Sequence, residues 1–167
     1  MIKKITIIIA LSFVFLGFSQ EVKLKKGSVL IDGNPWLKYQ DCGGFDSTCS
    51  LLNNTGDEII FFKWIKVPGA EPRIPSNPEG NLTYVEISFL GLNKKFEIQK
   101  TQKNIIEMIY LGKIVNEDGT LNEEKVNRMV EKYGTPFSDR LNAGTKNTII
   151  IRDEPSRGSG VNINIGR

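Results

Sequence analysis

The longest stretch with a strand-like pattern runs from Glu58 to Val67 and reads EIIFFKWIKV. With a period of two, one face of this stretch carries Ile59, Phe61, Lys63, Ile65 and Val67, and the other carries Ile60, Phe62, Trp64 and Lys66. β-branched and aromatic residues favour a strand over a helix. A strand that is apolar on both faces is usually covered on both faces. We therefore expect Glu58–Val67 to lie inside a sheet rather than at its edge.

Shorter alternating runs before this stretch predict further strands. Ser28–Ile31 and Trp36–Tyr39 are separated by a turn that contains glycine, asparagine and proline, so they predict a hairpin. Glu21–Lys26 predicts an edge strand, and Ser50–Leu52 leads into the central stretch. The region Lys26–Val67 is therefore expected to form an antiparallel meander.

The segment Pro68–Gly80 holds four of the seven prolines in the chain. This density excludes a helix and favours an extended chain. A connection of 13 residues is also long for a compact domain. Two interpretations remain open: a strap that crosses to the far edge of the sheet, which we favour, or a binding loop.

A second hairpin and two helices are expected after this segment. Thr83–Leu90 alternates, and Phe96 and Ile98 continue the pattern beyond a turn at Gly91, giving one apolar face. Thr101 is suited to cap a helix over Gln102–Leu111, and Gly112 to end it. Apolar residues cover most of the circumference of this helix, so the helix should be well buried. These apolar residues are Ile105, Ile106, Met108, Ile109 and Leu111.

The second helix begins with a capping-box pattern, Thr120-Leu121-Asn122-Glu123. A single apolar stripe follows, formed by Val126, Met129, Val130 and Tyr133. Gly134 and Pro136 are expected to end this helix.

The rest of the chain predicts a loop and two more strands. Leu141–Lys146 has no regular pattern, whereas Thr148–Ile151 and Val161–Ile165 are apolar or alternating, with a polar turn at Asp153–Gly160 between them. The pattern as a whole predicts an α+β fold in a single domain. Its sheet is mainly antiparallel with about six to eight strands, and two helices are inserted before the last strands.

The N-terminus has the three-part pattern of a cleaved secretory signal peptide. Lys3 and Lys4 precede an apolar run, Ile5–Phe18, and the small residues Gly17 and Ser19 stand at the positions expected for cleavage before Gln20. The run of 14 residues is shorter than the ~20 that a membrane-spanning helix needs. We therefore expect residues 1–19 to be removed and residues 20–167 to form a soluble bacterial protein, exported to the periplasm or beyond.

Charge and composition exclude several classes of function. The signal holds two of the 22 basic residues and none of the 19 acidic ones, which leaves a mature net charge of +1. Nucleic acid is not expected as a partner, because phosphate binding needs clustered positive charge. The chain also has no histidine, which excludes Ser-His-Asp and Cys-His nucleophiles and histidine metal sites. We expect no cofactor.

The two cysteines, Cys42 and Cys49, are the simplest candidates for a disulfide in an exported protein. Gly43-Gly44 allows the tight turn that would bring their sulfur atoms together. The alternatives are two free thiols, or a metal or redox site that also uses Asp41 and Asp46. A closed zinc site needs four nitrogen or sulfur ligands, which this chain does not offer.

Two motifs resemble ion-binding loops but lack the required spacing. Asn116–Glu124 resembles a calcium loop, yet its glycine is misplaced, so a turn followed by a helix cap explains it. Arg157–Gly160 resembles part of a phosphate-binding loop, without the full glycine spacing or a following Lys-Ser/Thr. A hairpin turn is the simpler interpretation there.

Two carboxylate pairs are compatible with glycoside hydrolysis, which does not need histidine. They are Asp41 with Asp46, and Glu86 with Glu97 across the second hairpin. For the second pair we favour the simpler interpretation, a solvated sheet face.

Aromatic residues gather in the sequence around the cysteine loop. The candidate binding surface consists of Trp36, Tyr39, Phe45 and Trp64, with Arg73 from the proline-rich segment. If these rings are exposed, they favour sugar or protein binding, whereas core packing is the ordinary alternative. We expect a non-catalytic exported module that binds a protein, an envelope component or a small ligand. A carboxylate-based glycan hydrolase and a purely structural or assembly protein are the alternatives.

Overall fold

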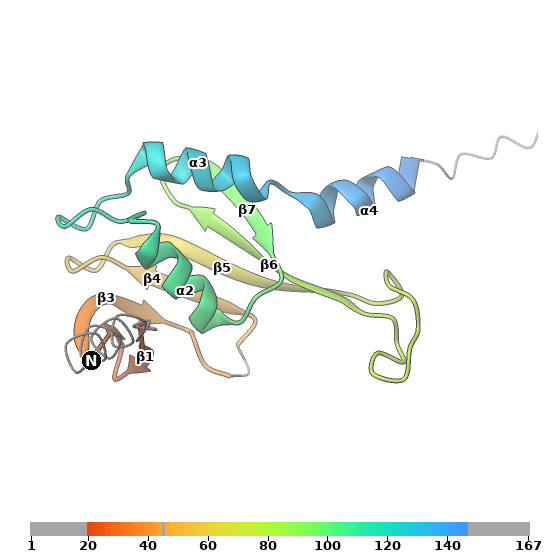
Figure 1. The fold of residues 1–167 in the computed structure, drawn as a ribbon, viewed down its shortest axis with the longest axis horizontal. Coiled ribbons are helices and arrows are strands. Elements are labelled where there is room, and N and C mark those ends of the chain that lie inside the picture. Colours follow the sequence, from red (N-terminus) through yellow and green to blue (C-terminus); the bar gives the residue numbers. More distant parts are fainter. Residues whose placement is uncertain (1–19, 45, 147–167) are drawn as a thin grey trace, which may run out of the picture.

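The computed structural model describes residues 20–44 and 46–146. These residues form one seven-stranded sheet followed by three helices (Figure 1). The strands are β1 (Val22–Lys25), β2 (Ser28–Ile31), β3 (Asn34–Gln40), β4 (Thr48–Leu52), β5 (Glu58–Val67), β6 (Leu82–Phe89) and β7 (Lys94–Ile98); the helices are α2 (Gln102–Leu111), α3 (Glu123–Tyr133) and α4 (Pro136–Lys146). The expected α+β fold with an antiparallel sheet is confirmed. The predicted signal and the two predicted strands after residue 147 lie outside the described residues.

The sheet is a continuous meander in which every strand pairs antiparallel with the next one in the sequence. The central stretch is β5, which lies between β4 and β6 as expected. In its register Phe62 lies opposite Cys49 on one side and Ile87 on the other. These three side chains are fully buried, so the middle of β5 is the centre of the core.

The proline-rich segment 68–80 is not a crossover strap, and that interpretation was wrong. β5 and β6 pair directly out to Val67 and Leu82, so the segment only joins the two strands of one hairpin. In Figure 1 this hairpin and its loop project beyond the rest of the sheet, and we call residues 64–84 the arm. The loop has internal order, because Ile74 bridges to Asn77, whose side-chain amide bonds to the backbone of Asn81.

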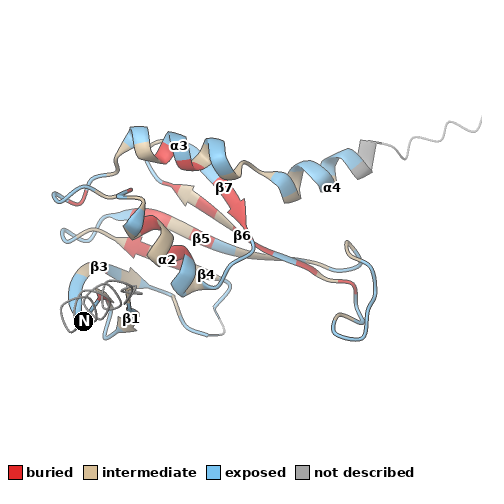
Figure 2. Ribbon diagram, in the orientation of Figure 1, coloured by how far each residue is buried: buried red, intermediate tan, exposed pale blue. Residues whose placement is uncertain are grey.

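One face of the sheet is covered by α2 and α3. Figure 2 shows the buried positions on the central strands and on these two helices. Ile105 and Ile109 of α2 are completely buried. From α3, the ring of Tyr133 stacks on Phe96 of β7 with centroids 5.3 Å apart. This face therefore carries the hydrophobic core.

The opposite face is covered only in part, contrary to the expectation for β5. Ile59 is buried, but Phe61 and Ile65 are half-buried and Lys63 is exposed. The N-terminal end of α4 packs further along this face, where Phe137 stacks on Tyr84 of β6 at 4.9 Å. The chain crosses from one face to the other around β7, where the N–H of Glu97 donates to the carbonyl of Gly134.

The first two helices largely match their sequence patterns. Thr101 caps α2 and Gly112 ends it, as expected, but Leu111 is 58% exposed, so the helix is less buried than its composition suggests. For α3, the capping residue is Asn122 rather than Thr120. The hydroxyl of Thr120 instead donates to Asp118 in the preceding turn. Among the described helices, none has the length and apolar character needed to cross a bilayer.

The loop expected over Leu141–Lys146 is wrong, because these residues form the second half of α4. Pro136 stands at the first position of this helix, where a missing N–H costs nothing. The next two N–H groups, of Phe137 and Ser138, donate to the carboxylate of Glu97 from β7. A tertiary contact thus provides the cap, whereas the hydroxyl of Thr135, the residue before the helix, donates to Asp139.

Candidate functional site

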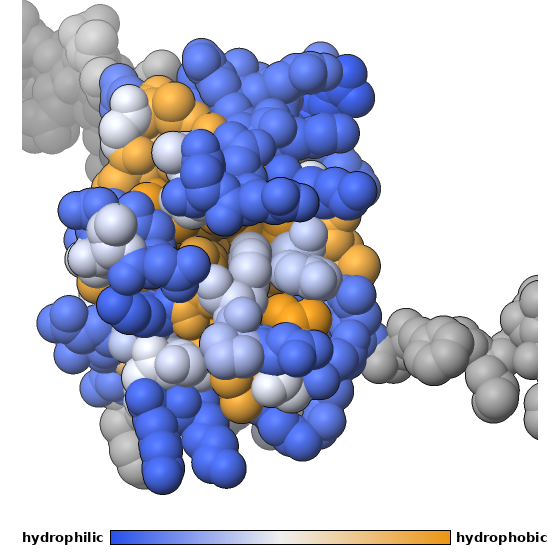
Figure 3. Space-filling view, turned by 90° about the vertical axis from the view of Figure 1, so that its left-hand side faces the viewer, coloured by the Kyte–Doolittle hydropathy of each residue, from blue (hydrophilic) through white to orange (hydrophobic). Residues whose placement is uncertain are grey.

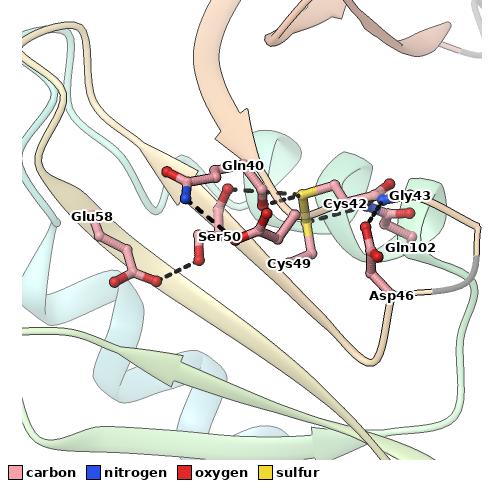
Figure 4. Close-up of a disulfide and its surroundings, with 9 residues drawn as sticks. Gln40, Cys42, Gly43, Asp46, Cys49, Ser50, Glu58 and Gln102 are labelled. Atoms are coloured by element: carbon pink, nitrogen blue, oxygen red, sulfur yellow. Dashed lines mark hydrogen bonds between the residues drawn. A yellow bond between two sulfur atoms is a disulfide. The ribbon is translucent and has the colours of Figure 1, made fainter.

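Cys42 and Cys49 form a disulfide, as expected from the sequence. The loop that they close is tied to the start of α2, because the side-chain amide of Gln102 donates to Cys49 Sγ at 3.1 Å and contacts the Cys42 carbonyl at 3.4 Å (Figure 4). Within the loop, the carboxylate of Asp46 accepts the N–H of Gly43 at 2.6 Å. The two sulfur atoms are therefore not free for metal binding, and no cluster of three metal-ligating side chains occurs among the described residues.

A cleft of about 610 Å³ lies between β3, the end of α2 and the loop that leads to α3. Its aromatic wall is formed by Trp36 and Tyr110, whose rings are 5.1 Å apart and nearly perpendicular. Leu111, the most exposed large apolar residue among those described, lines the same cleft. We call this hollow the Trp36 cleft. Figure 3 looks onto this end of the molecule, where apolar and pale surface is framed by hydrophilic residues.

Two polar loops form the rim of the Trp36 cleft, and each is held by its own hydrogen bonds. In the β4–β5 turn, the side-chain oxygen of Asn53 accepts the N–H groups of Gly56 and Asp57. In the loop before α3, the amides of Asn116 and Asn122 bond to each other at 3.2 Å. Because these bonds hold both loops, the rim is preorganised.

The two loops are also packed against each other. Gly119 has a φ of +85°, and a Cβ atom there would lie 3.1 Å from the Cβ of Asn53. Only glycine combines this backbone conformation with so close an approach. A larger residue would therefore push the loops apart and change the shape of the cleft.

Several polar side chains around the cleft have no partner within the described residues. The indole N–H of Trp36 and the hydroxyl of Tyr110 make no hydrogen bond there, although both rings are half-buried. The ammonium groups of Lys113 and Lys125 and the carboxylate of Glu117 are unpaired in the same part of the chain. Neither of these two polar ring atoms is buried, so both are open to solvent. The cleft therefore offers donors that a ligand can use.

The carboxylates in the rim loops are held in the charged form by hydrogen bonds. Thr55, and after it Asn53, lower the pKa of Asp57 by donating to its carboxylate. The side chain and then the backbone N–H of Thr120 lower the pKa of Asp118 in the same way. At neutral pH both carboxylates are therefore charged, and they accept hydrogen bonds that hold the loops.

The predicted surface residues are not gathered at one place. Trp36 lines the cleft, whereas Trp64 packs at 6.2 Å from Phe62 and lines a separate hollow of about 330 Å³. Tyr39 is half-buried against the core, Arg73 is exposed in the arm, and Phe45 lies outside the described residues. Trp36 and Trp64 therefore line different hollows, and a binding role for the five residues remains a prediction.

Sequence reasoning missed Tyr110 and the role of the loop before α3. Tyr110 lies in a helix whose circumference is mostly apolar, so nothing local marks it as a binding residue. The polar run Asn116–Glu124 was the available signal, because it resembled a ligand loop and now forms part of the rim. Its glycine spacing excluded calcium, but not a role in holding another kind of ligand.

The carboxylate pairs named as possible catalysts are engaged in structural contacts. Glu86 and Glu97 do lie opposite each other in β6 and β7. However, Glu97 is 1% exposed and both of its oxygens accept from Phe137 or Ser138, while Glu86 forms an ion pair with Lys95 at 2.7 Å. The second pair is Asp41 and Asp46; Asp41 contacts Gln40, and Asp46 is used within the cysteine loop.

The chain has no detected relative from which a function could be carried over. Compared with protein-family models, curated proteins and solved structures, it gives no significant match in any of the three. What the protein does is therefore inferred from the chemistry of the Trp36 cleft.

Proposed function

We propose that this protein is an exported, non-catalytic binding module that holds a small ligand in the Trp36 cleft. The observation that carries this proposal is the half-buried pair Trp36 and Tyr110, whose polar atoms lack partners within the described residues and which line a hollow of ligand size. Ligand pockets typically have volumes of ~300–1,000 Å³ and combine apolar walls with a few convergent polar groups. The cleft has a volume in this range, and it combines an aromatic wall with polar and charged side chains.

Export is supported by the disulfide and by the pattern at the N-terminus. Disulfides persist in oxidising compartments such as the periplasm or the cell exterior, and Cys42 and Cys49 form one. Residues 1–19 have the layout of a secretory signal. Both features are in keeping with a binding protein that meets its ligand outside the cytoplasm.

A binding role fits the cleft better than hydrolysis does. Glycoside hydrolysis needs two carboxyl groups ~5–10 Å apart on either side of the substrate. Glu117 is the one acidic residue among those that line the Trp36 cleft. With no histidine in the chain, the cleft also lacks the usual general base.

Assembly through sheet edges is disfavoured by the residues at those edges. β1 carries Lys23 and Lys25, and β7 carries Lys94 and Lys95. Lysines on edge strands oppose pairing with another sheet. The outer edge of β7 is also partly used, because Glu97 donates its N–H to Gly134.

The proposal can be tested by NMR on the oxidised protein, because the chain has only two tryptophans. A library of small polar and aromatic fragments is titrated while the two indole N–H signals are followed. We expect hits to shift the Trp36 signal and to leave the Trp64 signal in place. Trp36→Ala should abolish these interactions, and Trp64→Ala, the matched control, should retain them. Hits that shift only the Trp64 signal, or no hits at all, would overturn the proposal.

A further inference from the structure

The charges around the Trp36 cleft indicate which class of ligand it takes. We propose that the ligand is an acidic saccharide, meaning a sugar ring or short glycan that carries a carboxylate. This inference rests on the proposed function, since it assigns a ligand class to the same cleft.

The aromatic pair suits a sugar ring better than a flat or purely apolar ligand. Trp36 and Tyr110 meet at an interplanar angle of 82°, so together they form a corner rather than a flat slot. A pyranose has a face of C–H groups that can lie on an aromatic ring, while its hydroxyl groups point outward around its edge. A corner of two half-buried rings can contact such a ring on its face and its side.

The polar groups at the corner match the hydroxyl groups of a sugar. The indole N–H of Trp36 is a donor, and the hydroxyl of Tyr110 can donate or accept. The exposed side chain of Asn54, which also lines the cleft, offers an amide with both functions, whereas it is the backbone carbonyl of Asn54 that accepts from the Lys38 ammonium group at 2.9 Å. None of these three side chains has a hydrogen-bond partner in the part of the chain that the structure describes. A lipid-like ligand would leave all three unsatisfied, at a cost in affinity.

The charges favour a single negative group on the ligand. Lys113 and Lys125 line the cleft without an ion-pair partner among the described residues, and Glu117 is the opposing acid. An ammonium group binds a carboxylate through charge-assisted hydrogen bonds, which are stronger than neutral ones. A doubly charged phosphate is less well suited, because Glu117 would repel it. The site also contains no arginine, and the start of α3 is already capped by Asn122.

The test compares an oligosaccharide that contains a hexuronic acid with the same oligosaccharide after its carboxyl group has been reduced to a neutral alcohol. Binding to the oxidised protein is measured by calorimetry and by the Trp36 indole signal. We expect the acidic form to bind about tenfold more tightly than the neutral form. This preference should shrink as salt is raised from 0.05 M to 0.5 M, because Lys113 and Glu117 are exposed and Lys125 is only half-buried.

Substitutions of the two cleft lysines test whether they cause the preference for the acidic form. Lys113→Gln and Lys125→Gln should each weaken binding of the acidic form several-fold more than binding of the neutral form. Lys63→Gln, on the opposite face of the sheet, is the control and should change neither. Equal affinity for the two forms, or equal effects of all three variants, would overturn the inference.

The remaining outcomes separate this inference from the proposed function. If the neutral form binds as tightly as the acidic one, and Trp36→Ala abolishes that binding, the preference for acidic sugars is wrong and the binding module stands. If no saccharide binds but fragments still shift the Trp36 signal, the proposed ligand class is wrong, and the proposal that the Trp36 cleft binds a small ligand stands. If no probe of either kind shifts that signal, both proposals fail.

Discussion

Glu97 keeps its carboxylate inside the protein because donors from a helix forty residues later surround it. The side chain is 1% exposed, and it accepts the N–H groups of Phe137 and Ser138 and the Ser138 hydroxyl. Its charge also lies at the positive end of α4, where a carboxylate is favoured. The alternation of β7 suggested a solvated position for this residue. Burial was not visible because nothing in the sequence of β7 shows that the start of α4 covers this position.

Replacement of Glu97 by glutamine should lower the free energy of unfolding by about 2 kcal/mol. The side-chain NH₂ of glutamine is a donor, and in this buried site it would face the N–H and hydroxyl donors of Phe137 and Ser138. The measurement is urea unfolding followed by circular dichroism. Glu124→Gln is the control, since Glu124 forms an exposed ion pair with Arg128 on α3 and should change stability by less than about 0.5 kcal/mol. Equal effects of the two substitutions would show that Glu97 does not hold α4.

Asp57 provides a test of the rim at low pH. The hydroxyl of Thr55 is the main cause of its lowered pKa. A lowered carboxyl pKa stabilises the fold above the ordinary aspartate value of about 3.9, and this contribution is lost as the pH falls through the lowered pKa. Thr55→Val should therefore raise the pKa of Asp57 toward its ordinary value, measured by ¹³C NMR of the side-chain carboxyl group. Thr83→Val, at an exposed threonine in β6, should leave that titration unchanged. An unaltered Asp57 titration in Thr55→Val would contradict the assignment.

At the scale of elements, α4 shows how far a helix can depend on its surroundings. Its sequence offers few apolar positions, and among residues 136–143 only Phe137 and Leu141 are large and apolar. It is fixed instead by Glu97 at its start, by Tyr84 beneath Phe137, and by an ion pair between Arg140 and Glu71 of the arm at 2.6 Å. By contrast, α2 and α3 could be predicted from the sequence, because their apolar residues recur at helical spacing.

The cysteine loop is an element whose contribution to stability can be measured. Cys42 and Cys49 close a loop of eight residues, and such a crosslink is worth about 2.5 kcal/mol in the chain-entropy model. Reduction with dithiothreitol should lower the free energy of unfolding by that amount, measured by urea unfolding. The variant Cys42→Ser/Cys49→Ala should be insensitive to the reductant. A wild-type protein with both thiols titratable and no loss of stability would contradict this expectation.

At the scale of the whole molecule, the Trp36 cleft and the proline-rich loop lie at opposite ends. The β4–β5 turn, which borders the cleft, precedes the ten residues of β5, and the loop 68–80 follows them. Figure 1 shows the same separation along the long axis of the described chain. The loop therefore cannot act as a lid for the cleft, and its effect on ligand binding should be small.

Replacement of Glu71–Glu79 by Gly-Ser-Gly should leave the sheet intact. The ends of this segment are already close, because the N–H of Glu71 donates to the carbonyl of Gly80 at 2.9 Å. We expect the free energy of unfolding to fall by less than about 2 kcal/mol, from the loss of loop hydrogen bonds and of two surface ion pairs, Lys66 with Glu79 and Arg140 with Glu71. Circular dichroism and urea unfolding provide the measurement. Loss of the folded state would indicate that the segment supports the sheet, as a crossing strap would have done.

The sequence by itself determined the elements whose pattern is local. The period of two in Glu58–Val67 placed it inside the sheet, and the spacing of Cys42 and Cys49 around two glycines predicted the disulfide. Tertiary structure decided which groups meet: β5 with β6 across the loop, Glu97 with the start of α4, and Trp36 with Tyr110. The physical reason is that an alternating pattern records how far each residue is buried, but not which distant residue covers it. The cleft is built entirely from such distant contacts, and so only the folded chain reveals it.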